Sequence, residues 1–185
     1  MEPICVKLPE IRCNLEGFSR LADLYADLRH EALESILIDC SGTNWFHANM
    51  SAPFGVILDH IASLNHVRPF NFPQKVEQIL RRNNFLLGYR YEKMQDIYHT
   101  AIPYQRFAIN EHNSFALHIA EHLQPNYVPE MSAELKNRFV QSIHEIFANS
   151  AMHSETSHGI HVCGRHCNVN AAQSRCWFGA LVQAV

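Results

Sequence analysis

Three polar residues spaced four apart, Glu145, Asn149 and His153, are the part of this 185-residue chain best suited to chemistry. Positions four apart fall on one side of an α-helix, so these side chains would project from successive turns of one face. A carboxylate can orient or deprotonate a water molecule or a hydroxyl group. An asparagine carbonyl is a hard oxygen ligand of the kind that Mg²⁺ accepts. The row therefore combines a base and a metal ligand.

The surrounding sequence predicts a helix over residues 132–153. Ser132 is a natural N-cap, and Glu134 places a carboxylate near the positive end of the helix dipole. The polar row lies at the border of an apolar stripe, and such a border position is typical of residues that line a cleft. The alternative is an amphipathic helix whose border residues only form local hydrogen bonds. The expected stripe consists of Leu135, Phe139, Ile143 and Phe147, with Ile146 on the same side.

The spacing Glu-x-x-x-Asn-x-x-x-His resembles the N-box of the histidine-kinase-like ATPases, the superfamily that includes gyrase B, sensor kinases and anti-sigma kinases. The sequence HEIFANSAMHS, residues 144–154, carries this resemblance. The resemblance implies ATP and Mg²⁺ as cofactors. It assigns Asn149 to the magnesium and to cofactor binding, Glu145 to the catalytic, base-like role, and His153 to a polar contact near the phosphates.

The same superfamily has an Asp-x-Gly-x-Gly motif after the N-box, and the Asp of this motif reads the adenine amino group. In this chain the last acidic residue is Glu155, and residues 156–185 contain no Asp or Glu. Gly179 is the only glycine after Gly164. We therefore expect residues 126–185 to form a partial ATPase domain that stops, or changes reading frame, after its first strand. Adenine recognition is impaired in this interpretation.

The first two-thirds of the chain predict a small α/β layer. The segment 35–40 is rich in apolar and β-branched residues and predicts a strand buried on both faces. The two prolines within 124–129 make this segment the best domain boundary. Further helices are expected over 17–33, 51–65, 74–83 and 111–123, and further strands over 85–87, 104–109 and 159–164.

Residues 36–41, together with 49–58, resemble STAS domains, in which a strand ending in Asp precedes a helix that can carry a phosphorylatable serine. Asp39 stands at the end of the expected strand, and Ser51 begins the following helix. Ser51 is interpreted mainly as an N-cap and alternatively as a phosphorylation site. The fold expectation is α/β: a STAS-like small sheet with helices over 1–125, followed by an incomplete histidine-kinase-like ATPase α/β sandwich over 126–185.

The composition excludes some classes of function. Fifteen Lys and Arg against eighteen Asp and Glu give a net charge of −3, which argues against a nucleic-acid or membrane-surface partner. The chain has no signal-peptide pattern and no long apolar run, so a cytoplasmic, bacterial-type protein is expected. The predicted function is ATP-binding regulation in signal transduction, as an ATPase or protein kinase acting on a regulatory partner. The alternative is a non-catalytic STAS-like module for protein–protein interaction.

A zinc site is a further alternative, because histidines and cysteines concentrate near the end of the chain. On a strand over 159–163, His161 and Cys163 would point to the same face. The spacing nevertheless lacks a Cys-x-x-Cys knuckle, and chance clustering is the simpler interpretation. The candidate ligands are His158, His161, Cys163, His166, Cys167 and Cys176.

Overall fold

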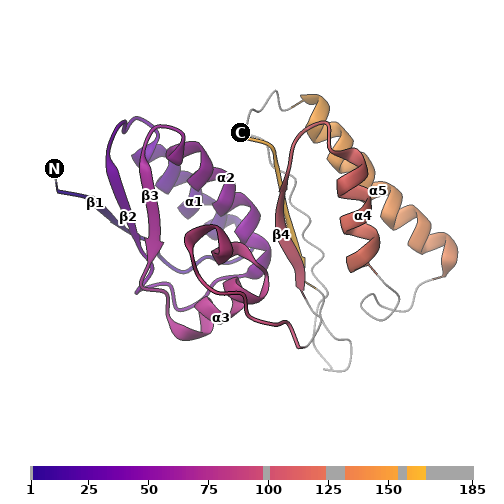
Figure 1. Ribbon diagram of the computed structural model, residues 1–185, viewed down its shortest axis with the longest axis horizontal. Helices are drawn as coiled ribbons and strands as arrows, with labels where there is room; N and C mark the ends of the chain where they lie inside the picture. Colours follow the sequence, from indigo (N-terminus) through magenta and orange to yellow (C-terminus); the bar gives the residue numbers. More distant parts are fainter. Residues whose placement is uncertain (1, 98–100, 124–131, 154–157, 166–185) are drawn as a thin grey trace.

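The protein consists of two α/β units, shown in the computed structural model of Figure 1. The structure describes residues 2–97, 101–123, 132–153 and 158–165. The first unit alternates strands and helices in the order β1 (Ile4–Lys7), α1 (Leu15–Leu28), β2 (Ser35–Asp39), α2 (Ser51–Ala62) and β3 (His66–Phe70). Its strands form a parallel sheet in the order β1-β2-β3. The α/β class expected from the sequence is confirmed.

The parallel sheet of the first unit has one buried and one open face. Ile36 and Ile38 of β2 point into the core with the packed helices α1 and α2, whereas Leu37 between them is only half-buried. The expectation that this strand is buried on both faces is therefore wrong. Leu37 stands in register between Cys5 and Arg68, which are both exposed. Among the described residues no helix covers this face of the sheet. Burial on one face only explains why buried and half-buried residues alternate along β2.

Three short helical segments complete the first unit: η1 (Ala48–Met50), α3 (Gln74–Arg82) and η2 (Phe85–Tyr89). The strand expected over 85–87 is wrong, because these residues form the 3₁₀-helix η2. Phe85 and Leu86 are buried while Leu87 is exposed. A short apolar run does not distinguish a strand from a helical turn, since both can bury two neighbouring residues.

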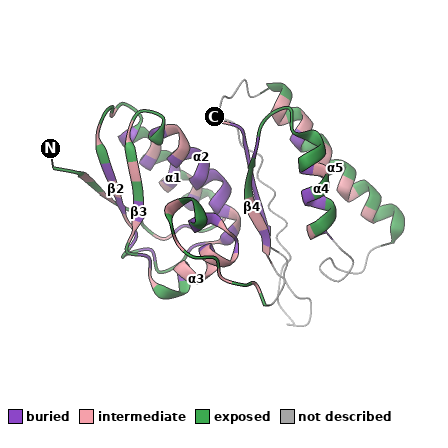
Figure 2. Ribbon diagram, in the orientation of Figure 1, coloured by how far each residue is buried: buried purple, intermediate pink, exposed green. Residues whose placement is uncertain are grey.

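The second unit is an antiparallel pair of strands with two helices packed against it. Strands β4 (Ala101–Phe107) and β5 (Ile160–Arg165) pair with each other, and α4 (His112–His122) and α5 (Ala133–His153) lie on one side of them (Figure 1). Figure 2 shows the buried residues of α4 and α5 facing these strands. The core of this unit contains Ile102, Phe107, Phe115, Ile119, Leu123, Ile143, Phe147, Ile160 and Val162.

The two-stranded sheet is buried on its other side as well, because it packs on the first unit. β5 contacts both α2 and η1, and the thiol of Cys163 donates hydrogen bonds to the carbonyls of Ala48 (3.4 Å) and Asn49 (3.3 Å). The second core draws residues from both sides of the 125/126 position expected as a domain boundary. The buried residues of the first core end at Leu86 and those of the second begin at Ile102, although Tyr104 of β4 also packs against the first core. Strands β4 and β5 thus form the wall shared by the two units.

Candidate functional site

Helix α5 is held by its cap and by one aromatic face. The Ser132 hydroxyl accepts a hydrogen bond from the Leu135 amide (3.2 Å), as expected for an N-cap. Ile143 and Phe147 are buried, and the Phe147 ring stacks on the Phe115 ring with centroids 4.1 Å apart. These contacts fix the rotation of α5 about its axis, and that rotation decides where the polar row lies.

The polar row lies farther from the core than its expected place at the border of the apolar stripe. Glu145, Asn149 and His153 are all exposed. Leu135 and Ile146 are exposed too, although both belong to the expected stripe. The reason is that α5 packs through a face turned toward its opposite side, where Val140, His144, Ala148 and Ala151 are half-buried. The row therefore lies on an open surface of the second unit.

The donor chemistry of the row fits a hydrated magnesium ion. Glu145 Oε1 accepts a hydrogen bond from Gln141 Nε2 (2.8 Å), which orients the carboxylate along the helix. The Asn149 amide forms no hydrogen bond to a described residue, so its oxygen is available as a ligand. Mg²⁺ keeps several of its water molecules and needs few protein ligands. Among the described residues, no group of three His, Cys, Asp or Glu side chains gathers to hold a metal.

A second polar cluster lies where α2 meets the shared wall. The Tyr104 hydroxyl and His161 Nδ1 are 2.7 Å apart, and His161 Nε2 lies 3.5 Å from Asp59 Oδ2. Arg106 donates a hydrogen bond to the same carboxylate oxygen at 2.8 Å. Asp59 comes from α2, Tyr104 and Arg106 from β4, and His161 from β5. We call these four residues the interface cluster.

Burial controls the ionisation of the interface cluster. His161 is completely buried, and desolvation lowers its pKa, although Asp59 acts in the opposite direction. Desolvation also raises the pKa of Tyr104, with Asp59 acting in the same direction. When His161 is neutral with its proton on Nε2, this N–H group faces Asp59. Nδ1 then accepts a hydrogen bond from the Tyr104 hydroxyl. The arrangement aligns a carboxylate, an imidazole and a phenol beside a cavity of about 270 Å³ that Asp59, Tyr104 and Arg106 line.

Sequence reasoning missed the interface cluster because its members stand alone in the chain. Asp59 and His161 are 102 positions apart by their numbers, and no motif joins them. Only the register of β4 against β5, which opposes Arg106 to His161, brings the side chains together. The one sequence signal for this cluster is the expectation that His161 and Cys163 point to the same face of a strand. That expectation is confirmed, since both contact the α2 and η1 side.

The remaining sequence candidates have structural roles among the described residues. Burial raises the pKa of both the Cys40 and the Cys163 thiols to about 12, which makes them poor nucleophiles and poor metal ligands. Ser51 is buried and accepts a hydrogen bond from Asn83 Nδ2 (2.8 Å); Met50 holds the N-cap position. The expected N-cap role of Ser51 is therefore wrong, and its burial argues against phosphorylation. The zinc candidates His166, Cys167 and Cys176 lie outside the described residues.

Two further findings concern the helices of the protein and its similarity to known proteins. Within the ranges that the structure describes, no helix is long and apolar enough to cross a lipid bilayer. In comparisons with known proteins, no family model matches the chain, and neither curated proteins nor solved structures give a significant match.

Proposed function

We propose that the chain is an ATP-binding regulatory protein of the histidine-kinase-like ATPase type, with its nucleotide site on α5. The observation that carries the proposal is the presentation of Glu145, Asn149 and His153 on one open side of a helix whose other side is anchored in a core. Side chains in successive turns of a rigid helix can contact a phosphate chain and its bound metal at the same time.

Each residue of the row has a distinct task in the proposed site. The Asn149 carbonyl would hold Mg²⁺, whose chemistry is to neutralise the phosphate oxygens. Glu145, oriented by Gln141, would position a water molecule or a hydroxyl group and accept its proton. His153 would add a polar contact at the end of α5. The proposed reaction class is phosphoryl transfer, either to water or to a protein partner.

Magnesium-dependent binding of ATP, measured by isothermal titration calorimetry on the full chain, tests this proposal. Wild-type protein should release heat with ATP and Mg²⁺, and Asn149→Ala should remove most of it. Asn137→Ala is the matched control, because Asn137 is exposed on the same helix but lies about three turns from Asn149. No heat with wild-type protein would reject ATP binding, and equal heats for both variants would reject the role of Asn149.

The second candidate is a non-catalytic module for protein–protein interaction. The specific observation in its favour is the sheet face that no described helix covers. The open face of the parallel sheet, with half-buried Leu37 between exposed Cys5 and Arg68, offers a surface for such contacts. The calorimetric experiment separates the two candidates, because a pure interaction module gives no heat with ATP and Mg²⁺.

A further inference from the structure

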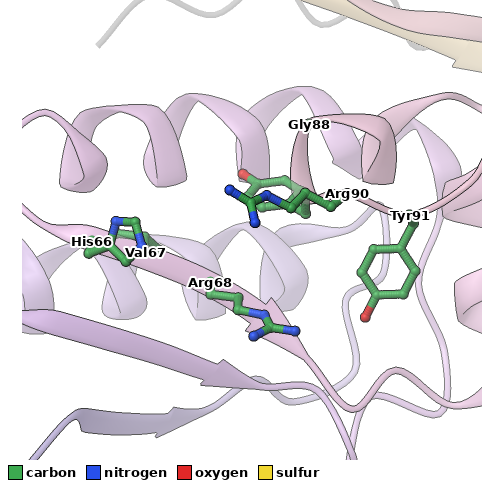
Figure 3. A pocket seen from close by; sticks show the side chains of 7 residues that line it. His66, Val67, Arg68, Gly88, Arg90 and Tyr91 are labelled. Carbon is green, nitrogen blue, oxygen red and sulfur yellow. The ribbon is translucent and has the colours of Figure 1, made fainter.

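A basic cleft of about 660 Å³ lies beside β3, remote in the chain from the polar row of α5 (Figure 3). β3 supplies His66, Val67 and Arg68, and the segment from Gly88 to Tyr91 supplies the opposite wall. Figure 3 shows Arg68 and Arg90 rising from these two walls, with Tyr91 beside Arg68. The volume lies within the range of about 300–1,000 Å³ that is typical of small-molecule sites.

The charge of the cleft is one-sided. None of the described residues that line it carries a carboxylate, in a chain whose net charge is −3. Arg68 and Arg90 are exposed and form no ion pair with a described residue. Glu77, which acts electrostatically on Tyr91, is paired with Arg81 at 3.1 Å. Two unpaired guanidinium groups that share a concave surface favour a ligand with a compact double-negative charge, because each can donate two hydrogen bonds to it.

The backbone of Arg90 places this side chain at the end of η2. Arg90 follows η2 with φ 68°, in the left-handed region that residues with a Cβ seldom adopt. A glycine would hold this conformation at lower energy, by roughly 1 kcal/mol. Gly88 is exposed and lies two residues before Arg90. The left-handed conformation nevertheless falls on Arg90 and not on Gly88. Arg90 is the C-cap of η2, and this conformation turns the chain from η2 toward Tyr91.

The edge of β3 argues against a peptide as the occupant. His66 donates its amide hydrogen to Glu34, and the Phe70 carbonyl accepts from Cys40, so these alternate residues face β2. The intervening Val67 and Pro69 consequently face the free edge. Proline has no amide hydrogen, so one of the two donor positions needed for an added strand is missing. The cleft is thus poorly suited to strand addition but open to a small molecule.

We propose that this cleft binds a small organic phosphate monoester, with the phosphate between Arg68 and Arg90 and the organic group against Tyr91. The site is separate from the proposed nucleotide site of α5, since its described lining residues include no carboxylate to retain Mg²⁺. A phosphate monoester carries nearly two negative charges and three acceptor oxygens at neutral pH. Its binding here requires no divalent metal.

The test is calorimetric titration of the full chain with phenyl phosphate and with inorganic phosphate, in the presence of EDTA. Phenyl phosphate should bind more tightly than inorganic phosphate, because only the former has a ring to place against Tyr91. Arg68→Gln and Arg90→Gln should each weaken binding at least tenfold. Arg29→Gln, at an exposed arginine outside the cleft, should change Kd less than twofold.

Each outcome either supports a specific phosphate site in the cleft or overturns it. Equal weakening by Arg29→Gln would show diffuse attraction and overturn the proposal, as would the absence of binding by wild-type protein. Tighter binding of a tetraglutamate peptide than of phenyl phosphate would overturn it in favour of a protein partner. Unchanged phenyl phosphate binding by Asn149→Ala supports a site independent of α5. Failure of ATP binding with Mg²⁺ therefore leaves this result unaffected. Circular dichroism spectra identical to wild type verify that each variant is folded.

Discussion

The Tyr104 hydroxyl lies 2.7 Å from Nδ1 of the completely buried His161, and this contact joins the two strands of the wall shared by both units. Its partners extend it across the interface, since Asp59 of α2 lies 3.5 Å from the other ring nitrogen of His161. A change in the first unit can therefore reach β5, and through β5 the core that anchors α5. The contacts form a continuous series of side chains from α2 to β5.

Removing the Tyr104 hydroxyl should destabilise the protein. Tyr104→Phe removes the hydroxyl that lies 2.7 Å from the buried His161 Nδ1, which should lower the free energy of unfolding by about 1–3 kcal/mol. Urea denaturation measures the loss. Tyr25→Phe is the matched control, because the Tyr25 hydroxyl lies 3.2 Å from His60 Nε2 in a half-buried pair that water can replace. Equal losses for the two variants would contradict a special role of the interface cluster.

Gly55 of α2 should be required for the close approach of β4. A Cβ at this position would collide with the Tyr104 hydroxyl oxygen. Alanine is favoured over glycine inside a helix by about 1 kcal/mol, yet overpacking of this kind costs about 1–3 kcal/mol. Gly55→Ala should therefore lower the urea midpoint, and the loss should shrink when Tyr104→Leu is added. Gly42→Ala, where a Cβ meets nothing within 4 Å, should leave the midpoint close to that of wild type.

The sequence predicts local structure well where hydrophobic periodicity is long. The helix expected over 132–153 is α5, with Ser132 as its cap, because the apolar repeat from Leu135 to Phe147 continues over about three helical turns. Short elements are harder to assign: β1 and β3 have no clear periodic signal, and the apolar run 85–87 is a 3₁₀-helix rather than the expected strand. The rotation of α5 about its axis also could not be predicted. His144 is half-buried because its ring contacts the Phe115 ring of α4, whereas Ile146 is exposed. The cluster at His161 depends on the register of β4 against β5, and the cleft at Arg68 depends on the packing of the segment from Gly88 to Tyr91 beside β3; a single sequence encodes neither locally.

Stability and ligand binding should separate along α5. Phe147 stacks on Phe115 in the second core, and Phe147→Ala should lower the free energy of unfolding by about 3–5 kcal/mol. Glu145→Gln and Asn149→Ala alter exposed side chains and should change it by less than about 0.5 kcal/mol. Chemical denaturation of the three variants checks this. A large loss in Asn149→Ala would show that the polar row is structural and would contradict its assignment to a ligand.

Acid should destabilise the second unit through His118 of α4. Burial lowers the pKa of His118 to about 4, with a further contribution from His122, whose ring centroid lies 4.6 Å away. The unfolded chain takes up this proton near pH 6.5 whereas the folded protein resists it, so stability falls as the pH drops from 6.5 toward 4. One such group costs the folded state about 2–3 kcal/mol of stability at pH 4.5. His118→Gln should flatten the pH dependence of the urea midpoint in this window. The matched variant His30→Gln, at an exposed histidine, should keep the wild-type slope. An unchanged slope in His118→Gln would contradict the assignment and would leave His161, whose pKa burial also lowers, as the group responsible.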